Sequence, residues 1–315
     1  MACLEIKEVD VELIEDELES HKYMKRAPII TIMGHVDHGK TTLLDSFRTD
    51  FDKCASEYGA ITQSIGAFTI KSPVVDDFAV DDQSDKSGDA LRGAVAGEVT
   101  FIDTPGHEAF QSMRARGAKV TDIIILVISA VESVQKQTIE VIELARQMHI
   151  PLIVAINKID RLEADVESVM LDLEANNMVP EDLGGDVICV PISAKEKVNL
   201  NLLRQKIEDL AKERVNLVED FTVPAQCIVI ESDVDEKSGQ ITATVIVKKG
   251  TLASDDIFVS GIHEGKVRMM LNDKGQSVKQ TFPGEAVHLT GFKHFPDVGN
   301  PLYVVKSSEE ARFIV

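Results

Sequence analysis

The chain has 315 residues, a formal net charge of −20, and 44% hydrophobic residues. This length suggests two domains, because single cores stop growing beyond roughly 250 residues. No apolar run in the sequence approaches the ~20 residues of a membrane span, so we expect no membrane partner. A chain this acidic is not expected to bind nucleic-acid phosphates nonspecifically, so any RNA partner must be met by a local patch or by parts outside this chain.

The first 220 residues predict an α/β domain behind an acidic lead-in. Residues 1–27 are rich in Asp and Glu, with room for one short helix. Apolar strands then alternate with amphipathic segments, which predicts a doubly wound, mostly parallel sheet. The expected strands are 29–33, 99–102, 123–128, 152–156 and 187–192, and the expected helices lie near 41–48, 135–148, 165–175 and 199–213.

The pattern changes after residue 218, where short β-rich runs are separated by glycine-containing turns. Such spacing predicts a small antiparallel β-barrel. We therefore expect an α/β domain at 28–220 and a barrel domain at 221–315. An acidic insert at 73–98 interrupts the first domain with six aspartates. A tolerated insertion is the simpler interpretation, since loop-closure entropy grows slowly with length, and a regulatory or partner-binding loop is the alternative.

A glycine-rich segment at 34–41, Gly-His-Val-Asp-His-Gly-Lys-Thr, fits the pattern G-x-x-x-x-G-K-[ST]. It follows an expected strand and opens an expected helix, the setting of a phosphate-binding loop. Glycines let the backbone turn tightly around phosphate oxygens, and the helix amino terminus presents N–H groups to them. Lys40 is expected to place its cation on the β- and γ-phosphates. The residues expected around the phosphates are Asp37, His38, Gly39, Lys40, Thr41 and Thr42.

The segment after the expected strand 99–102 reads Asp103-Thr104-Pro105-Gly106-His107. Gly106 has no side chain, so its N–H can approach the γ-phosphate, and this contact is lost when that phosphate leaves. His107 stands where a residue that positions the attacking water belongs, because imidazole can orient water and titrates near neutral pH. The alternative is a solvent-facing loop histidine. We predict that His107 is catalytic.

Mg²⁺ is expected to accompany the nucleotide, held by hydroxyl and carboxylate oxygens. Thr41 follows the lysine of the phosphate loop and offers a hydroxyl. Asp103 lies at a strand end opposite that loop and can hold the ion through water. Thr62 is the candidate second hydroxyl ligand, because glycine before it permits movement, although Thr42 and Thr69 compete on sequence alone.

Two further strand ends carry residues suited to guanine. Asp160 can accept hydrogen bonds from the ring N–H and the exocyclic amine, whereas adenine would leave this carboxylate unpaired at a cost of about 1–3 kcal/mol or more. Asn157 can tie loops together, the stem of Lys158 can lie along the base, and the Ala194 N–H can donate to the guanine carbonyl. The residues expected to bind the base are Asn157, Lys158, Asp160, Ser193, Ala194 and Lys195.

These motifs together resemble translation initiation factor 2 of the bacterial or mitochondrial type. The phosphate loop in its setting, 32–42, has the form seen in translational GTPases in general. Narrower matches to translation initiation factor 2 lie at 59–67, 103–110, 113–118, 121–123, 249–252 and 265–268. The resemblance covers about 28–315 and is strongest in the first domain. It implies that 28–220 is a GTP-binding domain and that the barrel at 221–315 is equivalent to domain II of translation factors.

The resemblance implies a monomeric GTPase that uses GTP, GDP and Mg²⁺ and hydrolyses GTP on the ribosome with His107. Val36 and Ile61 would form an apolar gate that keeps His107 from the water until ribosomal RNA repositions it. Such a factor promotes initiator tRNA positioning and the joining of ribosomal subunits. The family binds initiator tRNA through later domains that we do not find in this chain.

Several positions depart from the family. Ala60 replaces a usual glycine of the first switch, and Ser64 replaces a common histidine. Val131-Glu132-Ser133 replaces a usual Asp-Asp-Gly, at a place expected to lie away from the nucleotide. These departures and the acidic insert favour a mitochondrial matrix protein over a bacterial cytoplasmic one.

Two rival hypotheses remain open at the level of sequence. An elongation-type or other ribosome-associated GTPase shares most motifs, but the stretch 113–117 argues against it. A non-hydrolysing GTP-sensing interaction module is the other rival, favoured by Ala60 and the insert. In the barrel, either contact with ribosomal RNA or an ordinary solvated sheet face would explain the basic residues Lys248, Lys249, Lys266 and Arg268.

Overall fold

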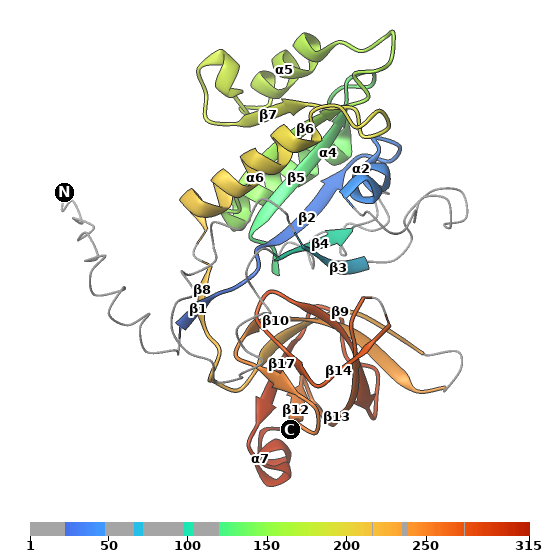
Figure 1. The fold of residues 1–315 in the computed structure, drawn as a ribbon, viewed down its shortest axis with the longest axis vertical. Helices are drawn as coiled ribbons and strands as arrows, with labels where there is room; N and C mark the ends of the chain where they lie inside the picture. The colour runs from blue at the N-terminus through green and yellow to red at the C-terminus, as the bar shows by residue number, and fades with distance from the viewer. Residues whose placement is uncertain are drawn as a thin grey trace, which may run out of the picture.

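The computed structural model describes residues 23–47, 66–71, 98–103, 120–215, 217–234, 239–273 and 275–315. Within these ranges, no helix combines the length and the apolar character needed to cross a membrane. Figure 1 shows an α/β body in the upper part of the view and a β-barrel below it. The predicted fold class is therefore confirmed.

The α/β body is built on a six-stranded sheet with the order β3-β4-β2-β5-β6-β7. Only β3 runs antiparallel to its neighbour; the other neighbouring pairs are parallel. The strands are β2 (Ile29–Gly34), β3 (Gly66–Lys71), β4 (Glu98–Asp103), β5 (Ile123–Ser129), β6 (Leu152–Asn157) and β7 (Ile188–Pro191). The helices are α2 (Lys40–Phe47), α4 (Lys136–Met148), α5 (Val166–Ala175), the 3-10 helix η5 (Glu181–Leu183) and α6 (Leu200–Arg214).

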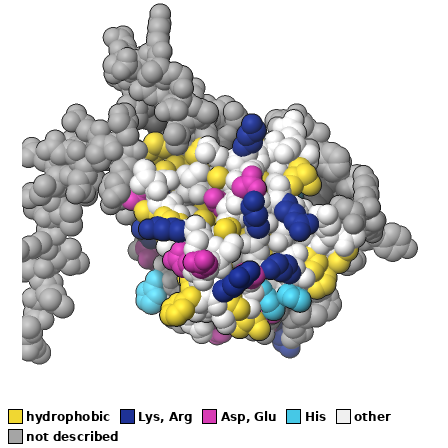
Figure 2. Space-filling view, turned by 90° about the horizontal axis from the view of Figure 1, so that it is seen from below, with side chains coloured by type: hydrophobic (Ala, Val, Ile, Leu, Met, Phe, Trp, Pro, Cys, Tyr) yellow, Lys and Arg dark blue, Asp and Glu magenta, His cyan; other side chains and the backbone are white. Residues whose placement is uncertain are grey.

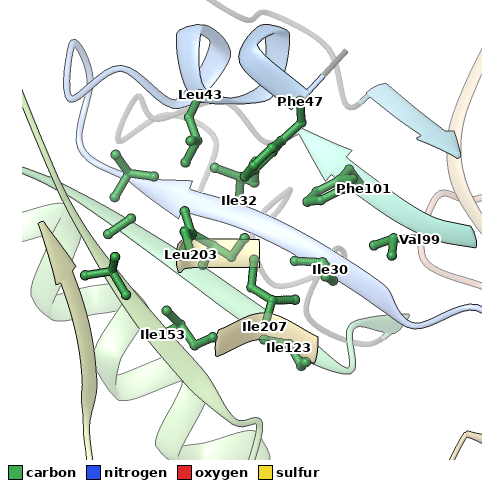
Figure 3. Close-up of a cluster of buried hydrophobic side chains, with 14 of the residues drawn as sticks. Ile30, Ile32, Leu43, Phe47, Val99, Phe101, Ile123, Ile153, Leu203 and Ile207 are labelled. Atoms are coloured by element: carbon green, nitrogen blue, oxygen red, sulfur yellow. The ribbon is translucent and has the colours of Figure 1, made fainter. Parts of the chain in front are cut away.

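Helices cover both faces of the sheet, which is why the central strand β5 is apolar throughout. Successive side chains of a strand point to opposite faces. Ile123 and Ile125 pack in one cluster with α2 and α6, whereas Ile124 and Leu126 pack in a second cluster with α4 and α5. Figure 3 shows the first cluster, in which side chains of α2 and α6 meet those of β2, β4 and β5.

The barrel closes through six antiparallel strands in the order β12-β17-β9-β10-β16-β13, with β13 pairing back to β12. Its apolar interior contains Val229, Val245, Phe258 and Leu289, all buried. The strands are β9 (Gln226–Val234), β10 (Ile241–Lys249), β12 (Ile257–Ser260), β13 (His263–Leu271), β16 (Ala286–Phe292) and β17 (Pro301–Val305). Smaller elements are β11 (Leu252–Ala253), β14 (Ser277–Val278), β15 (Gln280–Thr281) and helix α7 (Ser308–Ile314).

Apolar residues from both bodies form a common cluster. Ile29 and Ile102 of the sheet pack with Ile230 and Ile246 of the barrel. Near this cluster, strand β1 (Tyr23–Lys25) pairs antiparallel with β8 (Val218–Asp220). The body and the barrel are thus joined by apolar packing as well as by the chain. A domain division near residue 220 remains a prediction, and the predicted insert at 73–98 lies outside the described residues except for Glu98.

An ion-pair cluster lies at the same junction. Arg26 donates to both carboxylate oxygens of Asp122, at 2.6 and 2.8 Å, and both side chains are buried. Asp122 also accepts the Ile29 amide at 2.8 Å. Lys248 of β10 donates to the Val120 carbonyl at 2.9 Å, and its Nζ lies 3.9 Å from Asp122 Oδ1. Lys248 therefore joins the barrel to the α/β body.

The basic residues of the barrel consequently have different environments. Lys248 is partly buried against Val120, and this burial lowers the pKa of its ammonium group. Lys266 is more exposed and lies 2.6 Å from Asp255, while Arg268 is exposed on the same strand. Figure 2 shows the molecule from the barrel side, with lysine and arginine side chains spread among acidic, histidine and apolar ones. Lys248, Lys266 and Arg268 thus do not form one uniform basic surface.

Candidate nucleotide-binding site

Predicted site residues follow the carboxyl ends of parallel strands, and neighbouring strand ends share one edge of the sheet. In the register of these strands, Gly34 pairs with Val127, and Ser129 pairs with Asn157. Asp103 ends β4 level with Ile32 of β2 and is fully buried. Open α/β sheets bind ligands outside the carboxyl ends of their strands. The structure therefore gathers the described motif residues at the edge where a ligand is expected.

The phosphate loop makes close contacts that require glycine at two positions. Gly34 has φ +148°, and a Cβ there would lie 2.3 Å from the Val127 carbonyl oxygen. Gly39 has φ +91°, and a Cβ there would lie 2.4 Å from Asn157 Nδ2. Lys40 begins α2, is buried, and donates to the His35 carbonyl at 2.6 Å. The loop thus folds tightly against β5 and against the first guanine-motif residue.

Asn157 ties the phosphate loop to the two segments predicted to bind the base. Its Nδ2 donates to the His38 carbonyl at 2.9 Å, and its Oδ1 accepts the Ala194 amide at 3.0 Å. A bond from the Ala194 amide to a guanine carbonyl would therefore be shared with Asn157. Since Asn157 is almost fully buried, these bonds fix three loops relative to one another.

Asp160 is held in place by the neighbouring loop. Ser193 Oγ donates to Asp160 Oδ1 at 2.7 Å, and Ser193 Oγ in turn accepts the Glu196 amide at 3.1 Å. The hydrogen bond from Ser193 lowers the pKa of Asp160, so the exposed carboxylate stays ionised at neutral pH. An ionised carboxylate can only accept hydrogen bonds, which suits the two donors on the edge of guanine. Lys195 lies nearby in sequence, exposed and 3.4 Å from Glu196.

His38 is a buried histidine inside the phosphate loop. Its Nδ1 lies 3.3 Å from the Val127 carbonyl oxygen, and because a carbonyl only accepts, Nδ1 carries the proton. Its Nε2 has no hydrogen-bond partner within the described part of the chain, and Glu132 Oε2 lies 3.7 Å away. Burial lowers the pKa of His38 from 6.5 to about 4. His38 is therefore neutral at physiological pH.

The lowered pKa of His38 predicts acid sensitivity. The unfolded chain takes up this proton below about pH 6.5, whereas the native protein does so only near pH 4. His38 therefore lowers the free energy of unfolding as the pH falls through this window, by at most about 3 kcal/mol, and has no such effect above it. Urea unfolding between pH 7 and pH 4 should show a shallower pH dependence in His38→Gln than in wild type. His294→Gln, an exposed control, should keep the wild-type slope; equal slopes in wild type and His38→Gln would contradict the prediction.

Several predicted residues lie outside the described part of the chain. These are the metal ligand Thr62, the gate residue Ile61, the switch glycine Gly106 and the catalytic histidine His107. Val36, the other gate residue, is described, and its amide donates to Gln137 Oε1 at 3.3 Å. The roles of all five residues remain predictions.

The structure corrects one expectation and adds two residues. Glu132, expected away from the nucleotide, lies between the phosphate loop and Lys158, with 3.2 Å between its Oε1 and Lys158 Nζ. Gln137, which sequence reasoning did not single out, is buried against the phosphate loop through Val36. Their signal is positional: both follow the carboxyl end of β5, the same kind of place as the recognised motifs. The sequence does not show which side chains turn toward the site.

Comparison with known families agrees with this arrangement. The model of the elongation factor Tu GTP-binding domain matches residues 25–213. The chain belongs to the elongation factor Tu GTP-binding family. The model of elongation factor G domain 2 matches residues 224–305, which contain the six barrel strands. The family membership thus covers the α/β body, and a second translation-factor domain covers the barrel.

Individual proteins give a more specific relationship than the two family models. The chain is 45% identical to translation initiation factor IF-2 of Orientia tsutsugamushi, over 97% of this chain and 34% of that protein. It is 41% identical to IF-2 of Treponema denticola, over 98% of this chain and 31% of that protein. The chain thus spans about a third of the length of these relatives. The predicted resemblance to translation initiation factor 2 is confirmed.

Solved structures give the same picture. GDP-bound aIF5B from Aeropyrum pernix superposes with a TM-score of 0.64 at 28% identity, over 92% of this chain and 56% of that one. The bacterial selenocysteine-specific elongation factor EF-Sec superposes with a TM-score of 0.63 at 23% identity, over 88% of this chain and 45% of that one, and supports the fold alone.

Proposed function

We propose that this chain is the GTP-binding and barrel part of a translation initiation GTPase related to IF-2. The observation that carries the proposal is the hydrogen-bonded junction of Asn157, which joins the phosphate loop at His38 to the guanine loop at Ala194. A ligand with both phosphates and a base would contact the two loops together. The names of the relatives and the GDP-bound aIF5B neighbour support a guanine nucleotide and a role in initiation.

The phosphates bind to the loop that begins α2. Lys40 offers its ammonium group, and the amide groups of 37–42 surround the phosphates at the helix amino terminus. Asp160 and Lys158 bind the base, positioned by Ser193 and by Asn157. The residues proposed at this site are Asp37, His38, Gly39, Lys40, Thr41, Thr42, Gly106, Asn157, Lys158, Asp160, Ser193, Ala194 and Lys195.

Mg²⁺ fits the donor set at the same edge. Thr41 supplies a hydroxyl and Asp103 a carboxylate, both buried, and hard oxygen donors of this kind suit Mg²⁺. Thr62 is proposed as the third protein ligand. When bound, the ion neutralises charge on the β- and γ-phosphates.

Hydrolysis is assigned to the segment after β4. His107 orients the attacking water. The segments that carry Gly106 and Thr62 depend on the γ-phosphate, so loss of that phosphate releases both segments. The ribosome stimulates the step by repositioning His107. Initiator tRNA is bound by other parts of the full-length factor, which acts as a monomer.

The setting that the relatives support is a bacterial cytoplasm. IF-2 relatives from Orientia and Treponema are bacterial, and the mitochondrial matrix expected from the departures in sequence finds no support among them. The departures at Ala60 and Ser64 therefore do not indicate a mitochondrial source.

Nucleotide competition tests the binding part of this proposal. Fluorescent GDP bound to the chain should be displaced by GTP and by GDP, and ATP should require at least about a hundredfold higher concentration, because Asp160 has no donor pair to accept from adenine. Displacement by ATP at the same concentration as GTP would contradict the assignment of Asp160.

Turnover with and without ribosomes tests the catalytic part. The isolated chain should hydrolyse GTP slowly, bacterial ribosomes should accelerate it, and His107→Ala should remove the acceleration while leaving GDP affinity unchanged. Binding without turnover under either condition would favour the rival GTP-sensing module instead.

A further inference from the structure

Glu132 lies in the turn between β5 and α4, and its carboxylate faces two loops at once. One oxygen, Oε1, lies 3.2 Å from Lys158 Nζ in the segment that follows β6. The other, Oε2, lies 3.7 Å from His38 Nε2 in the phosphate loop. The side chains of Glu132 and Lys158 are 41% and 26% exposed, whereas that of His38 is fully buried. The carboxylate thus forms an ion pair with Lys158, whereas the neutral His38 offers it no proton at Nε2.

The backbone that carries Glu132 is itself held. Its carbonyl accepts Gln135 Nε2 at 2.6 Å, and the Ser133 amide donates to the Ser129 carbonyl at 2.9 Å. Ser133 Oγ also donates to Asp172 of α5 at 2.5 Å. The turn therefore presents the Glu132 carboxylate from a fixed position rather than from a free loop.

The ion pair with Glu132 restricts the side chain of Lys158. Its backbone is in the left-handed region, with φ +67°, and its long side chain would otherwise sample many rotamers. Ordering such a side chain when a ligand binds costs about 0.5–1.5 kcal/mol. An ion pair that orders it beforehand removes part of that cost from the binding step.

We propose that Glu132 is a positioning residue for guanine nucleotides: it holds Lys158 in place so that the lysine stem lines the base site before the nucleotide arrives. The inference rests on the proposed guanine-nucleotide function and deepens it. Glu132 touches neither base nor phosphate and acts through Lys158.

The direction in which the Kd changes when the Glu132 charge is removed distinguishes a positioning role from simple charge repulsion. A carboxylate near bound phosphates would repel them, so removing its charge would then tighten nucleotide binding. If instead it positions Lys158, Glu132→Gln should weaken binding of GDP by about three- to tenfold, the range expected for a partly exposed ion pair and one side chain's ordering. The two readings predict opposite changes in Kd.

The experiment measures the Kd of fluorescent GDP for wild type, Glu132→Gln, Lys158→Met and the double variant. We expect each single variant to raise Kd and the double variant to match Lys158→Met alone, because Glu132 acts through that lysine. Glu163→Gln, which removes an exposed carboxylate beyond Asp160, should stay within about twofold of wild type. The preference for GTP over ITP, which lacks the amine bound by Asp160, should be unchanged in Glu132→Gln.

Three results would overturn the inference: an unchanged or lowered Kd in Glu132→Gln, an undiminished effect of Glu132→Gln in the Lys158→Met background, or an altered GTP/ITP preference. Failure of the proposed function itself would look different, since wild type would then bind no guanine nucleotide. Circular dichroism of each variant confirms that the α/β body remains folded.

Discussion

Asp160→Asn is expected to weaken binding of GDP and GTP by about 100-fold or more. In the proposed site the carboxylate would accept two charge-assisted hydrogen bonds from guanine, each contributing about 1.5–3 kcal/mol, and asparagine would turn one acceptor into a donor that faces the exocyclic amine. Because Asp160 is exposed, we take the lower end of that range. Equilibrium titration with fluorescent GDP measures the change.

The same variant should gain affinity for xanthosine diphosphate. Xanthine carries a carbonyl where guanine carries the amine, so an asparagine amide can accept from the ring N–H and donate to that carbonyl. A simple loss of structure would weaken both nucleotides. The exchange of preference therefore identifies Asp160 as the residue that selects the base.

Two matched variants complete this test. Ser193→Ala keeps the carboxylate but removes the 2.7 Å bond that orients it, so we expect a smaller loss of about three- to tenfold. Asp182→Asn removes an exposed charge of η5 and should leave GDP affinity unchanged. An Asp160→Asn protein that binds GDP as tightly as wild type would contradict the assignment of the guanine site.

Arg26→Met is expected to lower the free energy of unfolding by about 3 kcal/mol. Arg26 and Asp122 form a bidentate pair whose side chains are only 5% and 8% exposed, so the change leaves a buried carboxylate without its main partner. The estimate lies at the low end because Asp122 still accepts the Ile29 amide and lies 3.9 Å from Lys248. Urea unfolding followed by circular dichroism measures the effect.

A second substitution separates the charge from the packing. Arg26→Met combined with Asp122→Leu removes the uncompensated carboxylate and should recover part of the loss. Recovery should stay incomplete, because the Ile29 amide loses its acceptor. Arg268→Met, on an exposed position of the barrel, should change stability by no more than about 0.5 kcal/mol. Identical unfolding curves for wild type and Arg26→Met would contradict this account of the junction.

The long elements of the fold were predictable because their patterns are strong. Strand β5 is a continuous apolar run buried on both faces, and α4 follows the expected segment 135–148 to within one residue. The short strands were not predictable. They have two or three residues each and are β1, β8, β11, β14 and β15. Elements of this length show no periodicity, and their strand pairing depends on a distant partner, as β1 depends on β8.

The residues of the candidate site likewise fall into those that a local motif predicts and those that no local motif predicts. Lys40, Thr41, Asn157 and Asp160 were predicted from local motifs, because phosphate and guanine impose residue types at fixed spacings. Glu132 was expected to lie elsewhere, although it stands only 26 residues from Lys158. A charged residue in a turn carries no local signal of the direction in which its side chain points.

The sequence by itself determined which chemical groups follow each strand and hence that a phosphate loop and a guanine motif exist. Only the tertiary structure decided which strand ends are neighbours and which charges are buried between the two bodies. Lys248, an apparently free basic residue of the barrel, donates to a carbonyl 128 positions away in the chain. The physical reason is that burial and pairing are properties of packed surfaces, and the surfaces that meet here come from distant parts of the chain.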